Sequence, residues 1–142
     1  MTANTAKVEL HTALYAKLTS NNVIVAALSS LGFQAVYNIR GVPSGTKPQY
    51  ILIGDTQEMP KNAFGRKGYA LLTSIHLFTR DNGTFNADKA VDYLNGLFDQ
   101  PQQPLVLATL TVASMMYNMA NGVQDNDGLT WHLTLKYDIF IQ

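Results

Sequence analysis

The sequence contains no cysteine and little charge, and each shortage excludes a class of protein. Without cysteine the chain has no disulfide, no thiol nucleophile and no thiolate metal site. Only 14% of the residues are charged, and ten basic side chains balance ten acidic ones. The chain therefore lacks the overall positive field that holds DNA or an anionic membrane by charge alone.

Long apolar runs and an export signal are also missing. No apolar run approaches the roughly 20 residues of a membrane-spanning helix. The polar segment from Met1 to Glu9 lacks the basic and apolar parts of a secretory signal. With 46% apolar residues in 142, we expect one folded domain over residues 1–142, compatible with a reducing cytosol and unconnected with a membrane.

Apolar residues at helical spacing predict three helices. Leu10, Leu14 and Leu18 share one stripe of a helix over residues 6–18, and a second helix follows from Val23 to Leu31. Thr19, Ser20, Asn21 and Asn22 offer side-chain oxygens that can cap this second helix. The clearest helix runs from its expected cap, Asn86, to Phe98, with Ala87, Ala90, Val91, Leu94 and Leu97 on its apolar face.

Five segments have the composition of strands. They are residues 33–39, residues 49–56, a central strand over residues 69–79, residues 105–116 and residues 129–141. Apolar side chains occupy every second position from Leu129 to Ile141, so this last strand buries one face. The last two strands form a C-terminal hairpin, and both Asn121-Gly122 and Asp127-Gly128 are possible turns. The fold class predicted is α+β, a mainly antiparallel sheet with an N-terminal helical segment, one amphipathic helix on one face and a C-terminal β-hairpin.

Two loops are candidate protein contacts. Gln57 to Lys67 lacks apolar periodicity and reads as an exposed excursion between strands, while Asp125 to Gly128 forms the tip of the hairpin. Exposed apolar anchors beside basic residues are common in interfaces. The candidate interface residues are Met59, Lys61, Phe64, Arg66, Lys67, Asp125 and Asp127.

The motifs of catalysis and metal binding are absent. His11, His76 and His132 have no partners at metal-ligand spacing, and no serine lies in a GxSxG setting. The segment from Gly41 to Lys47 does not satisfy the phosphate-loop pattern, and Asp125 to Gly128 lacks the alternating ligands of a calcium loop. We expect neither an enzyme nor a cofactor or metal site.

Several segments together resemble the tail-completion, or tail-terminator, proteins of long-tailed, siphovirus-like bacteriophages. Leu14 to Leu18 with Val25 to Leu28 is similar to the opening helix of that family, and Pro48 to Ile53 resembles its first long strand. Gly68 to Phe78 followed by Ala87 to Phe98 matches its strand, turn and helix, and Asp125 to the C-terminus resembles its closing hairpin.

The resemblance implies a structural protein of the virion neck. Such a subunit forms a ring, commonly of six copies, that caps the major tail-tube protein and joins it to a head-side connector or stopper protein. DNA passes through the pore without sequence-specific binding, and assembly takes place in the host cytoplasm. Two alternatives stay open: another virion subunit of the tube or connector, and a small-ligand-binding or enzymatic α+β domain.

Overall fold

A five-stranded sheet organises the chain in the computed structural model, which describes residues 6–33, 35–38, 43, 49–61, 68–80, 85–101, 105–124 and 129–142. The strands are β1 (Ala35–Asn38), β2 (Tyr50–Pro60), β3 (Tyr69–Thr79), β4 (Val112–Gln124) and β5 (Trp131–Ile141). Their order across the sheet is β1-β2-β3-β5-β4. Only β1 with β2 is a parallel pair, so the sheet is mainly antiparallel.

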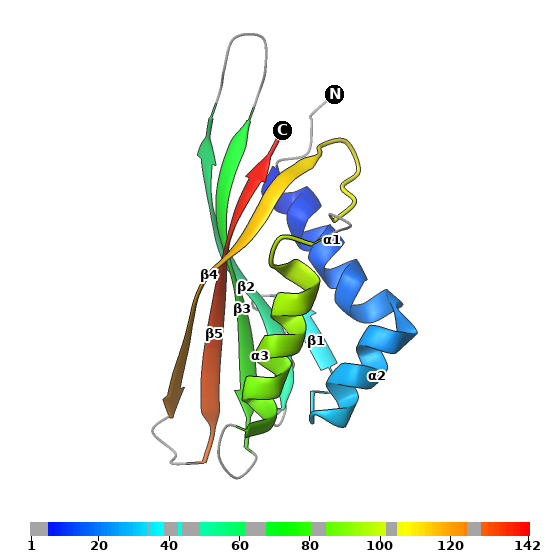
Figure 1. Ribbon diagram of the computed structural model, residues 1–142, viewed down its shortest axis with the longest axis vertical. Coiled ribbons are helices and arrows are strands. Elements are labelled where there is room, and N and C mark those ends of the chain that lie inside the picture. The colour runs from blue at the N-terminus through cyan, green and yellow to red at the C-terminus, as the bar shows by residue number, and fades with distance from the viewer. Residues whose placement is uncertain are drawn as a thin grey trace.

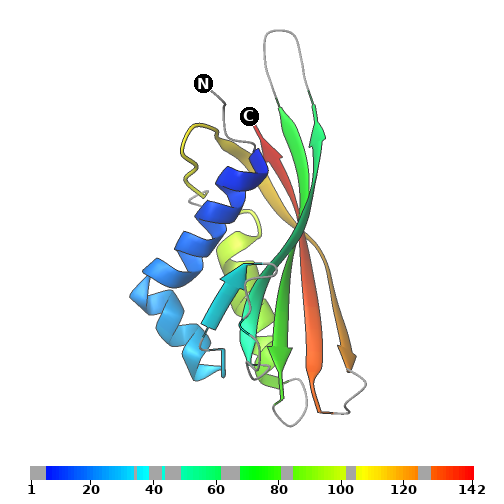
Figure 2. The ribbon, with the colours of Figure 1, turned by 180° about the vertical axis from the view of Figure 1, so that it is seen from behind.

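Three helices cover one face of this sheet: α1 (Ala6–Ser20), α2 (Asn22–Ser30) and α3 (Phe85–Phe98). Figures 1 and 2 show all three on the same side, with the opposite face of the sheet uncovered by any described helix. The core lies between the two layers. Its largest fully buried side chains include Leu10, Leu14, Leu18, Ile51, Ile53, Ile75, Leu77, Leu94, Phe98 and Tyr137. The predicted α+β class is confirmed.

The N-terminal helices follow the apolar spacing of the sequence. Leu10, Leu14 and Leu18 are each at most 1% exposed, because residues four apart lie on one side of a helix. Among the polar residues between the helices, Asn21 is the cap of α2, and its side chain accepts hydrogen bonds from the backbone N–H of Val23 and Ile24 at 3.0 and 3.3 Å.

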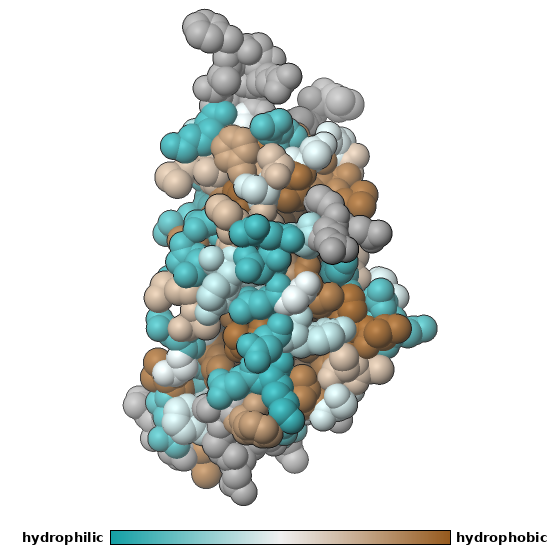
Figure 3. Space-filling view, viewed as in Figure 1, coloured by the Kyte–Doolittle hydropathy of each residue, from teal (hydrophilic) through white to brown (hydrophobic). Residues whose placement is uncertain are grey.

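Helix α3 packs against the last strand. The Phe98 ring meets Tyr137 edge-on at 6.0 Å, and the Tyr137 hydroxyl donates a 2.5 Å hydrogen bond to Asn95 Oδ1. Burial raises the pKa of Tyr137, so the hydroxyl stays a donor. The outward side of the helix is polar, and hydrophilic side chains gather over it in Figure 3. The helix begins at Phe85, so the prediction of Asn86 as its cap was wrong: Asn86 lies inside the first turn.

Gly96 is an exposed glycine within α3, and an added Cβ there meets nothing within 4 Å. We expect Gly96→Ala to stabilise the fold by about 0.5–1 kcal/mol, because alanine loses less backbone freedom in a helix. Urea unfolding checks the change in the free energy of unfolding. An unchanged or lower midpoint contradicts the open surroundings described for this position.

Strand β2 is longer than predicted. The segment from Gln57 to Pro60 pairs with Tyr69 to Leu72 of β3, and the Lys61 N–H donates to Gly68 O at 2.7 Å at the end of the pair. Gln57 to Pro60 therefore belong to β2 and not to the exposed excursion predicted from Gln57, and residues 62–67 lie outside the described residues. Pairing with β3 satisfies the backbone here, so the polar composition of these residues did not prevent a strand.

Strand β4 begins later than predicted. Residues 105–111 precede it: Val106 and Thr111 form an isolated bridge, and Thr111 exchanges two backbone hydrogen bonds of 2.8 Å with Gln142. The Glu9 carboxylate, 3% exposed, takes the place of a strand partner and accepts hydrogen bonds from Thr109 N, Thr109 Oγ1 and Leu110 N. Burial raises the pKa of Glu9, but these hydrogen bonds outweigh it and lower the pKa below its ordinary value.

Strand β4 continues to Gln124, past one of the two candidate turns. Asn121 and Gly122 lie within β4, opposite Thr134 and Leu133, so this dipeptide is not the turn. The other candidate turn, at residues 125–128, lies outside the described residues, as does most of the segment from Gly41 to Lys47.

Candidate assembly surfaces

The uncovered face of the sheet carries both apolar and polar side chains, the polar ones coming mainly from β5: His132, Thr134, Lys136 and Asp138. Side chains alternate along a strand, so the residues of β3 between its buried positions point away from the helices. Together with their neighbours they form a surface of partly or fully exposed apolar side chains: Leu52, Met59, Leu72, Phe78, Met116, Met119 and Phe140. Exposed apolar side chains gathered on one open sheet face are typical of a contact surface.

A hollow of about 300 Å³ lies on this face. Met59 of β2, Leu72 of β3, Met116 of β4 and Phe140 of β5 line it, and Met59 is 53% exposed. Met59 was predicted as an interface residue, and Lys61 lies exposed just after the same strand. The other predicted interface residues, Phe64, Arg66, Lys67, Asp125 and Asp127, lie outside the described residues.

A row of rings crosses four strands. Tyr37 of β1 meets Tyr50 of β2 at 5.5 Å between ring centroids, Tyr50 meets Phe78 of β3 at 5.0 Å, and Phe78 stacks on His132 of β5 at 4.3 Å. Aromatic pairs at these separations add about 0.5–1.5 kcal/mol each beyond their burial. Strand register alone brings these rings together, so no local pattern in the sequence revealed the row.

His76 and His132 form a direct pair at one end of this row. The His76 Nδ1 and His132 Nε2 atoms are 2.7 Å apart, and Thr134 Oγ1 is 3.2 Å from His76 Nδ1. Gly54 faces the ring of His76, where a Cβ atom would come within 2.4 Å. Burial lowers the pKa of His76, and the charges of His132 and Lys136 lower it further. The 2.7 Å contact fits one hydrogen bond between the two rings, in which the tautomers decide which nitrogen donates.

This pair should make stability depend on pH. The folded pKa of His76 lies below its ordinary value of 6.5, so the unfolded chain binds more protons as the pH falls below about 6.5, and stability falls with it. His11 adds to this effect, since burial also lowers its pKa. We expect the loss of melting temperature between pH 7 and pH 5 to be smaller in His76→Gln than in the natural protein. An equal loss in both proteins contradicts the assignment.

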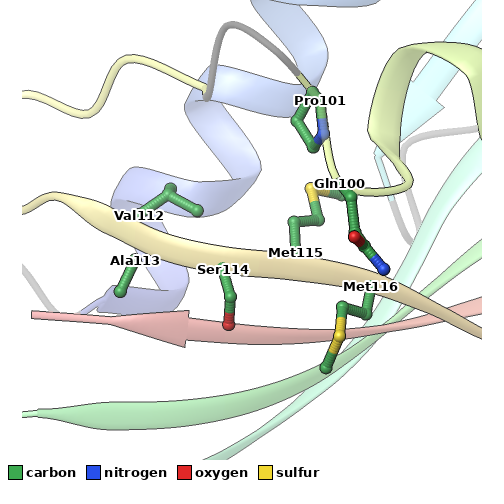
Figure 4. A pocket seen from close by; sticks show the side chains of 7 residues that line it. All are labelled: Gln100, Pro101, Val112, Ala113, Ser114, Met115 and Met116. Atoms are coloured by element: carbon green, nitrogen blue, oxygen red, sulfur yellow. The ribbon is translucent and has the colours of Figure 1, made fainter.

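The outer edge of β4 is the other exposed surface. The strand contains no charged residue, and its exposed apolar side chains include Met116, Tyr117, Met119 and Val123, the last 61% exposed. Near its start, the chain leaving α3 covers the edge: Gln100 N donates to Met115 O at 2.7 Å, and Tyr117 N donates to Asp99 Oδ1 at 2.8 Å. Figure 4 shows Gln100 and Pro101 above this part of β4, beside a second hollow of about 300 Å³.

Chemical groups for other kinds of site are scarce in the described residues. They contain no group of three or more His, Asp or Glu side chains able to hold a metal ion. Every buried side-chain nitrogen and oxygen in that part of the chain has a hydrogen-bond partner. None of its helices is long and apolar enough to cross a membrane.

The class that these features define is an α+β sheet protein with its described helices on one face of a mainly antiparallel sheet and the other face open. The same fold occurs in a chain of the virion of a native gene transfer agent particle, with a TM-score of 0.80 over 98% of both chains and 16% sequence identity. No family model and no curated protein matches this sequence. At this identity, the similarity establishes a shared fold over the full length of both chains.

Proposed function

We propose that this protein is a tail-terminator subunit, which assembles into a ring that caps a phage tail tube and joins it to the head-side connector. The observation that carries the proposal is the fold shared, over 98% of both chains, with a chain of a virion. A match of the entire chain is more informative than a match of one motif, because few residues lie outside the common architecture. The sequence resemblance to tail-terminator proteins points to the same role.

The surfaces of the chain support assembly. A ring requires two different surfaces on each subunit, because the first surface of one copy contacts the second surface of the next copy. The described sheet has two edges, β1 and β4, that lie on opposite sides of the molecule, and one open face with exposed apolar side chains. Such a subunit needs no catalytic group, and we propose a structural role without a cofactor or metal.

The proposed partners are other copies of this chain, the tail-tube protein and the head-side connector, with DNA passing through the pore. Met59 and Lys61 lie where β2 leaves the body of the sheet, next to the sequence segment that holds Phe64, Arg66 and Lys67. We propose that this end of the molecule contacts the tube or a neighbouring subunit. The hairpin tip with Asp125 and Asp127 is a second proposed contact.

Negative-stain electron microscopy of the purified protein distinguishes the possible roles. A terminator should form closed rings of uniform diameter, because its contact must close after a fixed number of copies. Long tubes formed by the protein alone would instead assign it to the tail tube. Single particles without any rings, at all concentrations, would contradict the assembly role and favour a ligand-binding domain.

A further inference from the structure

The outer edge of β4 is divided into a covered half and a bare half. At Met115 and Tyr117, the segment after α3 occupies the edge through the bonds of Gln100 to Met115 and of Asp99 to Tyr117. Beyond a bulge between Tyr117 and Met119, the segment from Met119 to Gln124 continues to pair with β5 on its inner side. In Figure 1 this last part of β4 extends past α3 along the side of the sheet.

The bare half presents backbone hydrogen-bonding groups to its outer side. In an antiparallel pair, every second residue points its N–H and C=O away from the partner strand. Met115 and Tyr117 do so, since their backbone groups bond to Gln100 and Asp99. Ala120 and Gly122 continue the series, because they face Leu135 and Leu133 as Tyr117 faces Tyr137. Both residues are exposed, so their outward groups are accessible to another strand.

The bare half also lacks the features that keep an edge strand from pairing. Monomeric proteins place lysine, proline or inward-pointing charge on such edges. The segment from Met119 to Gln124 has none of these, and Met119 and Val123 are 38% and 61% exposed. The backbone supplies hydrogen bonds and the side chains supply apolar contact, which are the two requirements of strand addition.

The opposite edge of the same sheet is a matching partner. Among the described residues, β1 pairs with β2 alone, so its other side is the second edge of the sheet. Strand β1 has four residues against the six from Met119 to Gln124. The pairing scheme makes β1 and β4 run in opposite directions, so a β4 edge placed beside the β1 edge of the next copy is antiparallel. A chain of zero net charge also meets little repulsion from its own copies.

We propose that the segment from Met119 to Gln124 pairs with β1 of a second copy of this chain and so continues the sheet from one subunit into the next. The inference rests on the proposed ring and names the contact that holds it together. Because the β4 edge meets a different edge on its neighbour, each copy keeps one edge free until the ring closes. In this arrangement Tyr37 of β1, which ends the row of aromatic side chains, lies close to Met119 and Val123 of the neighbouring subunit.

The variant Ala120→Pro tests this contact. Proline removes the outward N–H of Ala120 and leaves the bonds to β5 intact, because that N–H points away from β5. The control Ala120→Ser has a small side chain at the same site and keeps the N–H. A second variant, Val123→Lys, places a charge on the bare edge and leaves every backbone group in place. Circular dichroism and melting temperature show whether each variant folds, and light scattering gives its mass.

We expect Ala120→Pro and Val123→Lys to fold and to need at least a tenfold higher concentration for assembly, while Ala120→Ser assembles as the natural protein does. The amide proton of Gly122 should exchange more slowly in the natural assembly than in either monomeric variant. Rings formed equally well by Val123→Lys, with a fast-exchanging Gly122 amide, would overturn the strand pairing and leave the ring intact. A natural protein that stays monomeric at all concentrations would overturn both the pairing and the proposed function.

Discussion

Replacing Leu94 by aspartate is expected to unfold the protein. Leu94 is 0% exposed and lies in the middle of α3, where it packs against the sheet. The change removes an apolar side chain worth about 2–5 kcal/mol in a core and buries a carboxylate without a partner. The total is comparable with the roughly 5–15 kcal/mol that holds a typical domain together. The far-ultraviolet circular dichroism of the purified variant should lose its helical signal at 25 °C.

The matched control is Gly96→Asp, two positions further along the same helix. It adds the same charge at a site where an added Cβ meets nothing within 4 Å. We expect it to keep the fold with a change of under about 1 kcal/mol, since exposed substitutions have small effects. A Leu94→Asp variant that unfolds cooperatively, with a midpoint near that of the natural protein, would show that Leu94 of α3 contributes little to the stability of the core.

Tyr137→Ala should have the second largest effect. Tyr137 is fully buried, meets Phe98 and Tyr117 edge-on at 6.0 Å each, and donates to Asn95. Truncation removes the ring, leaves a cavity between α3 and the sheet and frees a buried amide oxygen. Losses of about 3–5 kcal/mol are usual for a large aromatic in a core, and the lost hydrogen bond adds to them. Urea unfolding gives the difference in the free energy of unfolding.

Tyr117 is the appropriate comparison, because it lies directly opposite Tyr137 on the neighbouring strand and is 38% exposed. Tyr117→Ala should cost about 1 kcal/mol, since much of that ring remains in water in the folded state. Equal losses in the two variants would mean that the ring of Tyr137 contributes no more to the core than an edge residue does.

The sequence was most informative where one element decides its own structure. The spacing of Leu10, Leu14 and Leu18 identified α1, and the apolar face around Leu94 identified α3 to within two residues. Alternation from Trp131 to Ile141 likewise identified β5. In each case the apolar residues repeat at helix or strand spacing over the whole element, so the positions that are apolar in the sequence are the ones buried in the structure.

The prediction failed where a residue far away in the sequence determines the local structure. Gln57 to Pro60 form a strand because they pair with β3. Residues 105–111 do not join β4, and Thr109 among them donates to the carboxylate of Glu9, about a hundred positions away in the sequence. The contact between His76 and His132 and the bare edge after Met119 depend on strand order, which the order of elements in the sequence does not specify. The exposed apolar side chains of the open face were partly visible in β3, whose apolar residues occur on both sides of the strand.

The mass of the assembled protein tests the central claim most directly. Light scattering across a range of concentrations should show a closed species of fixed mass, about six times the 15.6 kDa chain, that does not grow when more protein is added. A 15.6 kDa particle at every concentration, or a mass that increases without limit, would contradict a ring-forming tail terminator.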